Sequence, residues 1–220
     1  MKKSIQTLKM VLVFIVVGII ITLLCNAIKT DPFKSYQKIS AENILNNAED
    51  ESYYVYFYKT NCPYCENIES AIRDYAKAHS TLYFVNIEEN KEKFKSFDWK
   101  TFHSKNDIEI GKINNGKIEF YVNESEKKYT QYNQTDIYGK VKRYKIVEAD
   151  EDYIKLNKNA KKGYVYASLQ TPNIDYYNLT SKDRITLAGV PTMLHVTNGK
   201  IDQFYFDDVE IGPLMERLNH

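Results

Sequence analysis

Two cysteines three positions apart, Cys62 and Cys65, are the residues of this chain best suited to chemistry. They follow a run of aromatic and β-branched residues, 52–58, that predicts a buried strand. Apolar residues then recur at helical spacing from Ile68 to Ala76. Pro63 suits the first position of that helix, because the N–H that proline lacks has no partner there. Cys62 is therefore expected to cap the helix, and Cys65 to lie one turn inside it.

The cap position predicts a reactive thiol at Cys62. The N–H groups and the dipole at a helix start stabilise a thiolate, so the pKa of Cys62 is expected to fall below that of a free cysteine. A thiolate attacks a disulfide through a mixed-disulfide intermediate. Cys65 is near enough to resolve that intermediate. Cys62 is thus expected to be the accessible nucleophile and Cys65 the shielded resolving thiol.

Three other interpretations of the cysteine pair are open. The pair could be half of a zinc site, a static disulfide, or two buried apolar residues. A zinc site needs more ligands, and the third cysteine, Cys25, lies inside an apolar run. The histidines are not paired at metal spacing, so no metal is expected; they are His79, His103, His195 and His220. A static disulfide would make the protein a module that binds a partner or a metal.

A second motif, Gly189-Val190-Pro191-Thr192, leads directly into a predicted hairpin. The turn of that hairpin contains Asn198-Gly199, a strong hairpin signal between two apolar runs. A proline immediately before a strand indicates a cis X–Pro bond or the start of the strand. His195 lies in the middle of this strand without an acidic neighbour in sequence, which favours a structural role.

The order strand, Cys62–Cys65 helix, Val190-Pro191, hairpin and closing helix resembles the thioredoxin superfamily. The resemblance implies an α/β thioredoxin-like fold and a cis-proline lying against the cysteines. It implies thiol-disulfide exchange without a cofactor, with Pro63, Tyr64, Val190 and Pro191 contacting the substrate. Over this redox core the chain looks similar to anchored thioredoxin-like proteins such as the bacteriocin transport accessory proteins. Many relatives place an acidic residue six positions before the first cysteine, where this chain has Tyr56.

The chain departs from the family between its second predicted strand, 81–87, and Pro191. The intervening stretch of about 100 residues is far longer than an ordinary loop. Alternating and aromatic runs predict a β-rich insertion in the Tyr-rich region 98–175; tyrosines at strand spacing more often pack a sheet than form an interface. The remaining expected elements are helices at 40–45, 88–97, 175–187 and 213–218, and strands at 108–113, 117–122, 138–147, 153–156 and 164–169.

The first 28 residues are interpreted as an uncleaved signal anchor. Met10–Cys25 is uncharged and apolar, and with its flanks it approaches the ~20 residues that span a bilayer. A cleaved signal peptide ending near Ala27 is the alternative. The expected organisation is an anchor at 1–28, a tether at 29–39, the redox core at 40–97 and 176–220, and the insertion at 98–175.

These features predict an oxidoreductase held at the cell membrane with its catalytic domain outside the cytoplasm. A long folded region after an N-terminal anchor is normally translocated. The expected partners are protein thiols and disulfides outside the cytoplasm, and the recycling partner is expected to be a membrane redox protein or electron carrier. The net charge of +1 argues against nucleic acid as a partner.

Overall fold

The computed structural model describes residues 30–47, 49–180 and 183–219. The chain divides into two compact units, 1–35 and 36–220. In the first, the Asp31 carboxylate accepts a hydrogen bond from the Phe33 N–H at 2.9 Å, which closes a turn. No helix among the described residues is long and apolar enough to cross a membrane. The predicted anchor at 1–28 lies outside the described residues. The second unit is a mixed α/β structure, and the rest of the description concerns it.

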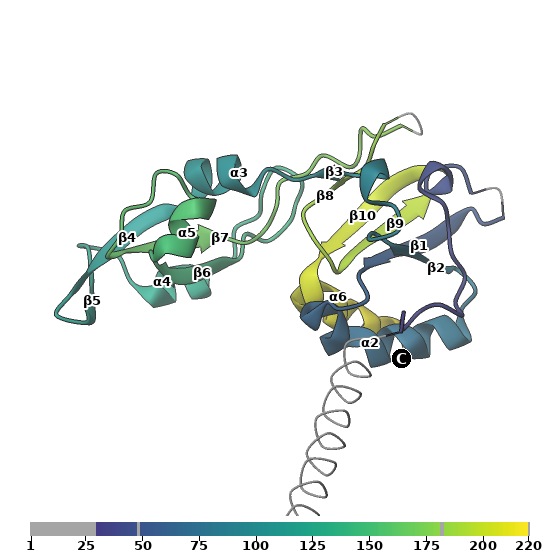
Figure 1. Cartoon of the computed structure of the whole chain (residues 1–220), viewed down its shortest axis with the longest axis horizontal. Helices are drawn as coiled ribbons and strands as arrows, with labels where there is room; N and C mark the ends of the chain where they lie inside the picture. Colours follow the sequence, from purple (N-terminus) through teal and green to yellow (C-terminus); the bar gives the residue numbers. More distant parts are fainter. Residues whose placement is uncertain (1–29, 48, 181–182, 220) are drawn as a thin grey trace, which may run out of the picture. The chain divides into compact units, whose positions relative to one another are not determined.

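The first sheet of this unit carries the cysteines. It contains β1 (Ser52–Tyr58), β2 (Leu82–Asn86), β9 (Thr192–Thr197) and β10 (Lys200–Phe206) in the order β10-β9-β1-β2. Strands β1 and β2 are parallel, whereas β9 is antiparallel to both β1 and β10 (Figure 1). The predicted strand at 52–58 and the predicted hairpin are confirmed. Residues far apart in the chain therefore meet in one sheet, because β9 joins β1 from a distance of more than a hundred positions.

The two faces of this sheet are covered differently. Helices α2 (Pro63–Ala78) and α6 (Asp207–Leu218) lie together against one face (Figure 1). They bury Ile68, Ile72, Ile211, Leu214 and Met215 there. The other face packs against irregular segments and the short 3-10 helix η1 (Ala41–Asn43). The buried residues of that layer include Ile44, Leu45, Phe94, Ile174, Tyr176, Ile185 and Leu187.

A second, fully antiparallel sheet is built from the insertion. Its strands are β4 (Ile108–Asn114), β5 (Lys117–Phe120), β6 (Tyr144–Glu148) and β7 (Tyr164–Leu169), in the order β5-β4-β7-β6. Helices α3 (Trp99–Asn106), α4 (Glu126–Thr130) and α5 (Glu151–Leu156) accompany it. A small core of Ile110, Tyr129, Val165 and Ala167 is buried in this sheet.

Two predicted helices, 88–97 and 175–187, are wrong for one shared reason. The first contains the 3-10 turn η2 (Lys91–Lys93) and strand β3 (Lys95–Ser96), and the described residues of the second, which leave out 181–182, contain only β8 (Thr186–Leu187). Strands β3 and β8 pair in parallel, and the N–H of Lys95 donates to the Ile185 carbonyl at 2.9 Å. These backbone groups bond between the two segments rather than within a helix.

The insertion also contains helices where strands or irregular chain are predicted. Residues 153–156 belong to α5 instead of a strand, and only the end of the predicted strand 138–147 pairs in the sheet. Each new helix begins after a polar cap: Asp98 accepts from the Thr101 N–H at 3.0 Å, and Asp150 accepts from the Tyr153 N–H at 2.8 Å. Capping of this kind satisfies N–H groups that the first helical turn leaves without partners.

Candidate functional site

Cys62 occupies the N-cap of α2, as the sequence predicts. Its sulfur accepts a hydrogen bond from the Cys65 N–H at 3.3 Å, and Pro63 follows as the first helical residue. Both cysteines are free thiols. When protonated, Cys62 donates to the Val190 carbonyl, with 3.4 Å between sulfur and oxygen. Strand β1, the start of α2 and the segment before β9 therefore meet at this sulfur.

The two thiols have opposite pKa shifts. The pKa of Cys62 is lowered to about 7, first by a hydrogen bond from the Cys65 thiol, then by backbone N–H groups of Cys65 and Tyr64, and last by the charge of Lys59. The pKa of Cys65 is raised, because its thiol donates to Cys62 and because it is buried. Near neutral pH, a large fraction of Cys62 is thus ionised to the nucleophilic thiolate, whereas Cys65 keeps its proton and can donate it in a hydrogen bond.

The expected contrast in accessibility between the thiols is wrong. Cys62 is 6% exposed and Cys65 is 5% exposed, so both are buried. The cap position places the Cys62 sulfur under the Val190 carbonyl rather than in open solvent. The difference between the two thiols therefore lies in hydrogen bonding and pKa rather than in exposure.

The other predicted site residues meet around Cys62. The Val190–Pro191 bond is cis, and Val190 contacts Cys62 through its carbonyl. Tyr64 is 60% exposed beside the thiol. The Pro191 carbonyl accepts a hydrogen bond from the Asp207 N–H at 2.9 Å, which ties this segment to the start of α6. Sequence reasoning did not identify Asp207, because its only signal is proximity created by the fold.

Tyr56 is completely buried beside Cys65. Burial and the neighbouring Cys65 thiol raise the pKa of Tyr56, so the phenol stays protonated at neutral pH. The neighbouring Tyr56 hydroxyl favours the charged form of Cys65 and lowers its pKa, but donation to Cys62 and burial together raise that pKa by more. A neutral phenol cannot take up a proton as a carboxylate does, but it can donate a hydrogen bond to the Cys65 sulfur.

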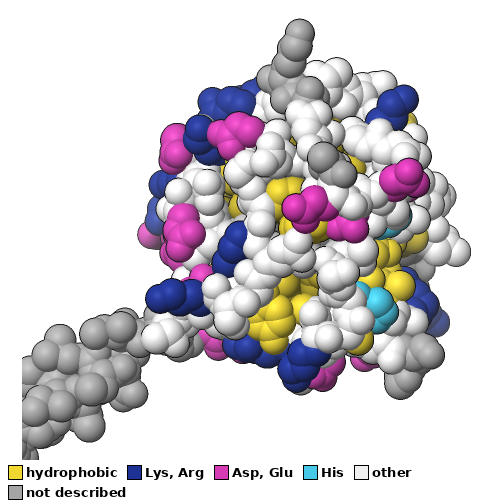
Figure 2. Space-filling model, turned by 90° about the vertical axis from the view of Figure 1, so that its right-hand side faces the viewer, with side chains coloured by type: hydrophobic (Ala, Val, Ile, Leu, Met, Phe, Trp, Pro, Cys, Tyr) yellow, Lys and Arg dark blue, Asp and Glu magenta, His cyan; other side chains and the backbone are white. Residues whose placement is uncertain are grey.

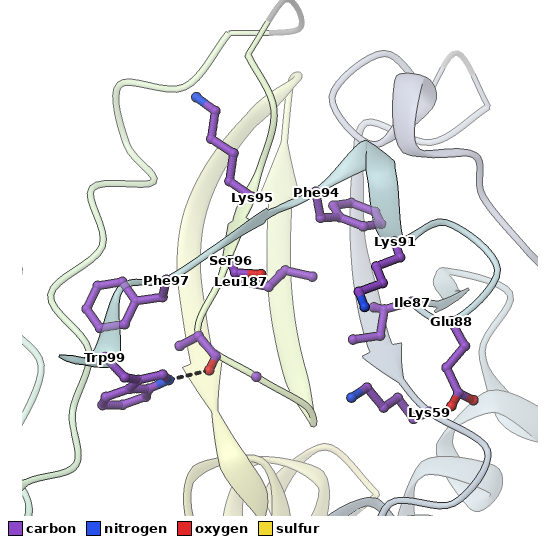
Figure 3. A pocket seen from close by; sticks show the side chains of 12 residues that line it. Lys59, Ile87, Glu88, Lys91, Phe94, Lys95, Ser96, Phe97, Trp99 and Leu187 are labelled. Carbon is purple, nitrogen blue, oxygen red and sulfur yellow. Dashed lines mark hydrogen bonds between the residues drawn. The ribbon is translucent and has the colours of Figure 1, made fainter. Parts of the chain in front are cut away.

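A cavity of about 440 Å³ lies beside the segment that precedes Val190 (Figure 3). Phe94, Leu187 and other apolar side chains line it, and Lys59 and Lys91 extend into it from one side. Trp99 closes the other side, where its indole N–H donates to the Ala188 carbonyl at 2.6 Å. The first residue of the insertion's first helix is thereby bonded to the backbone next to the thiol site.

His195 has an acidic partner that its sequence neighbours do not reveal. Its Nδ1 lies 2.6 Å from the Asp202 carboxylate across the β9–β10 hairpin, and its Nε2 lies 3.0 Å from the Ser52 hydroxyl. Serine hydrolases use residues of these three types. Here they cross three strands of one sheet, and neither cavity beside the thiols includes any of them. The cluster links β1, β9 and β10, which agrees with a structural role for His195.

Among the described residues, no three His, Cys, Asp or Glu side chains gather in a way that could hold a metal ion. Positive and negative side chains are interspersed over the face drawn in Figure 2, in keeping with the near-neutral composition. Comparison with protein-family models, with curated proteins and with solved structures found no match for this chain.

Proposed function

We propose that this protein is a thiol-disulfide oxidoreductase with a thioredoxin-like fold, acting through Cys62 and Cys65. The observation that carries the proposal is the pair of opposed thiols: Cys62 caps α2 with a pKa of about 7, and Cys65 donates to it with a raised pKa. A static disulfide would have no use for this asymmetry, whereas exchange needs one thiolate and one protonated reserve thiol.

The sheet topology supports the same proposal. A parallel β1–β2 pair is joined at the other edge of β1 by the antiparallel hairpin β9–β10. The cysteine helix follows β1, the cis Val190–Pro191 bond precedes β9, and α6 closes the chain. This is the arrangement that the resemblance to the thioredoxin superfamily implies. The irregular layer over the second face and the insertion are departures from it.

In the reaction, the Cys62 thiolate attacks one sulfur of a substrate disulfide. A Cys62–substrate bond forms, the substrate S–S bond breaks, and the second substrate sulfur leaves as a thiolate that takes a proton. Cys65 then loses its proton and attacks the Cys62 sulfur, which expels the substrate's first sulfur as a thiol. The substrate gains two electrons and two protons, and the Cys62–Cys65 pair is oxidised to a disulfide. The same steps in reverse oxidise a substrate dithiol.

Tyr56 and Val190 assist at separate steps. The Tyr56 hydroxyl stabilises the Cys65 thiolate that forms during resolution. While Cys62 is protonated, the Val190 carbonyl accepts a hydrogen bond from its S–H group, and this hydrogen bond is lost when the thiolate forms. Neither step requires a metal or a cofactor.

We further propose that the protein is held at the cell membrane with these residues outside the cytoplasm. The support is the apolar Met10–Cys25 run in the sequence, which lies outside the described residues. The substrates are then secreted or surface proteins, and a membrane redox partner recycles the thiols. In intact spheroplasts, added protease should digest the region that carries Cys62, and alkaline washing should leave the protein with the membranes.

The decisive experiment is thiol exchange by the full-length protein in detergent. Reduced protein should cleave the disulfides of insulin when a small dithiol regenerates it, and Cys62→Ser should abolish the reaction. Equilibration with dithiol buffers gives the reduction potential, which assigns the direction of electron flow. If neither a dithiol nor a protein disulfide exchanges with the wild-type Cys62–Cys65 pair, the oxidoreductase proposal is wrong and the cysteines form a static link.

A further inference from the structure

A groove of about 880 Å³ connects the thiol site to the insertion. On the thiol side it is lined by Tyr64, Val190, Phe206 and the first turn of α6. On the insertion side, aromatic side chains from several elements line it: Trp99, Tyr129, Tyr132 and Tyr144. Two of the residues that surround Cys62, Tyr64 and Val190, therefore also belong to this groove. A molecule bound in the groove would lie next to the reactive sulfur.

The side chains that the groove presents to solvent are mostly apolar. Tyr64 and Val209 are each 60% exposed, and Leu156 is 49% exposed. Two partly buried charges in its wall pair with each other, because the Arg143 guanidinium lies 2.9 Å from the Asp207 carboxylate. Recognition in the groove thus depends on aromatic and aliphatic contacts more than on charge.

The two walls are held together by polar contacts from the insertion to the first sheet and α6. Lys140 bonds to the Glu210 carboxylate and to the Phe204 carbonyl, each at 2.6 Å. Arg143 binds Asp207, whose N–H bonds to the Pro191 carbonyl. The groove is therefore formed before any substrate arrives, which lowers the entropic cost of binding.

The backbone beside the groove favours an extended polypeptide over a small apolar carrier. Strand β6 is at the edge of its sheet, where β7 is its only partner among the described strands, and its first residues, Tyr144 and Lys145, line the groove. An edge strand offers N–H and C=O groups that a further strand can pair with. A small apolar molecule has no use for such groups.

We propose that this groove binds an extended segment of a protein substrate, rich in aromatic or aliphatic residues, next to the cysteine that reacts with Cys62. The inference rests on the proposed function and specifies its substrates: cysteines in unfolded or extended chain with apolar neighbours. Cysteines flanked by polar residues, and small disulfides, are poorer substrates because they leave the groove empty.

The test compares two short peptides, each carrying one cysteine as a mixed disulfide with thionitrobenzoate. One has Phe and Leu near its cysteine, and the other has Ser and Asn at the same positions. Release of the coloured thiol by an excess of reduced full-length protein gives the second-order rate constant of a single turnover, which is equivalent to kcat/KM, for each peptide. We expect roughly a tenfold preference for the apolar peptide, the effect of one or two buried aromatic contacts.

Two matched pairs of variants locate that preference. Tyr132→Ala should bring the ratio of the two kcat/KM values close to one, whereas Tyr177→Ala, an exposed tyrosine outside the groove lining, should leave the ratio unchanged. Val209→Asp should also reduce the ratio, and Val122→Asp, at a site 89% exposed in the insertion, should not. The aspartate variants alter exposed positions, so their result does not depend on the tolerance of a packed tyrosine.

The outcomes separate this inference from the proposed function. Equal reaction of both peptides, unaffected by the groove variants, would overturn the groove assignment and leave the oxidoreductase intact. No reaction with either peptide or with a small disulfide would refute the function itself. A third outcome is that a soluble quinone slows the reaction of the protein with both peptides equally. If that inhibition is absent in Tyr132→Ala, the groove belongs to a small carrier and the inference is overturned.

Discussion

The tyrosines of β1 and those of the insertion differ in the partners of their side chains. In β1 the rings of Tyr53, Tyr56 and Tyr58 are completely or almost completely buried; Tyr53 packs on the same face as Phe57, and the other two point to the opposite face. In the insertion, tyrosine hydroxyls reach carboxylates instead: Tyr121 bonds to Glu109 at 2.7 Å, and Tyr153 bonds to Asp107 at 2.5 Å.

The two edge strands of the second sheet, β5 and β6, are less buried than β2 of the first. All five residues of β2 are buried, whereas β5 and β6 have none that are fully buried. The first sheet is stabilised mainly by apolar packing, and the insertion depends more on hydrogen bonds between side chains. The thiols proposed to react therefore lie beside the sheet with the more apolar core, whereas part of the groove wall proposed to contact the substrate belongs to the insertion, which we expect to be more easily perturbed.

The largest expected effect is at the thiols. Cys62→Ser should abolish exchange, because the serine hydroxyl is not ionised at neutral pH. Cys65→Ser should instead accumulate mixed disulfides with substrates, because the first step proceeds and the second cannot. Non-reducing gels of cells that express each variant distinguish them. Trapping by Cys62→Ser and none by Cys65→Ser would reverse the assigned roles.

The next largest effect tests the polar dependence of the insertion. The Asp107 carboxylate is fully buried and accepts hydrogen bonds from His103, Tyr153 and the Leu169 N–H. Asp107→Ala leaves these donors without an acceptor, which should cost about 3 kcal/mol or more. Hydrogen exchange should show lost protection in β7 and retained protection in β1.

Asp152→Ala is the matched control, because it removes a carboxylate that is 85% exposed on α5 and paired only with Lys155. Its effect on stability should stay within about 1 kcal/mol. If Asp107→Ala destabilises β1 as much as β7, the two sheets unfold together. Their difference in packing is then not accompanied by a difference in the free energy of unfolding.

Removing the Tyr56 hydroxyl should have a smaller, kinetic effect. Tyr56→Phe keeps the buried ring and deletes the donor that lowers the pKa of Cys65. Resolution of the mixed disulfide should slow by about tenfold, the value of one hydrogen bond to a charged group. Quenched-flow analysis of the Cys62 adduct separates this step from the first attack, whose rate should be nearly unchanged.

The smallest effect concerns the charge of Lys59. Alkylation of Cys62 by iodoacetamide should rise with pH around a midpoint of about 7, the pKa of this thiol. Lys59→Met should raise the midpoint by less than about one unit, and Cys65→Ala should raise it further, because the Cys65 thiol is the leading cause of the lowered pKa. A larger shift for Lys59→Met would reverse that order.

The lowered pKa also links stability to pH. Cys62 titrates at about 7 in the folded protein, compared with a reference value of 9.0. The folded reduced state therefore gains stability as pH rises from 7 toward 9, and it loses that contribution as pH falls through 7. Chemical denaturation of the reduced protein at several pH values measures this trend, and Cys62→Ser should flatten it.

The first sheet and the thiol site follow from short-range signals in the sequence. Each of these signals determines the structure of its immediate neighbours; they are the aromatic run of β1, the proline after Cys62 and the Asn-Gly turn. The elements can therefore be located from sequence. Segments 88–97 and 175–187 cannot, because β3 and β8 pair over about 90 residues and neither has a strand-like pattern. Asp98 and Asp150 are residues of a type that favours a helix start and so indicate α3 and α5. The alternating and aromatic pattern of the region favoured strands instead.

The groove could not have been predicted, because its walls come from distant parts of the chain. Arg143 and Asp207 are 64 positions apart, and no spacing rule connects them. The acidic partner of His195 was closer, since Asp202 is only seven positions away. Counting outward from the Asn198-Gly199 turn places Asp202 opposite His195; the strand register instead pairs His195 with Gln203 after a shift at Asp202, and the two side chains still meet.

Trp99 is the only tryptophan in the chain. Its indole stacks on His103 with 5.0 Å between ring centroids, and it lines both the groove and the cavity next to the thiol segment. All tryptophan fluorescence of the protein therefore originates at one position between the reactive cysteines and the insertion. The emission spectrum therefore measures changes in the environment of Trp99 without overlap from other tryptophans and without an attached dye.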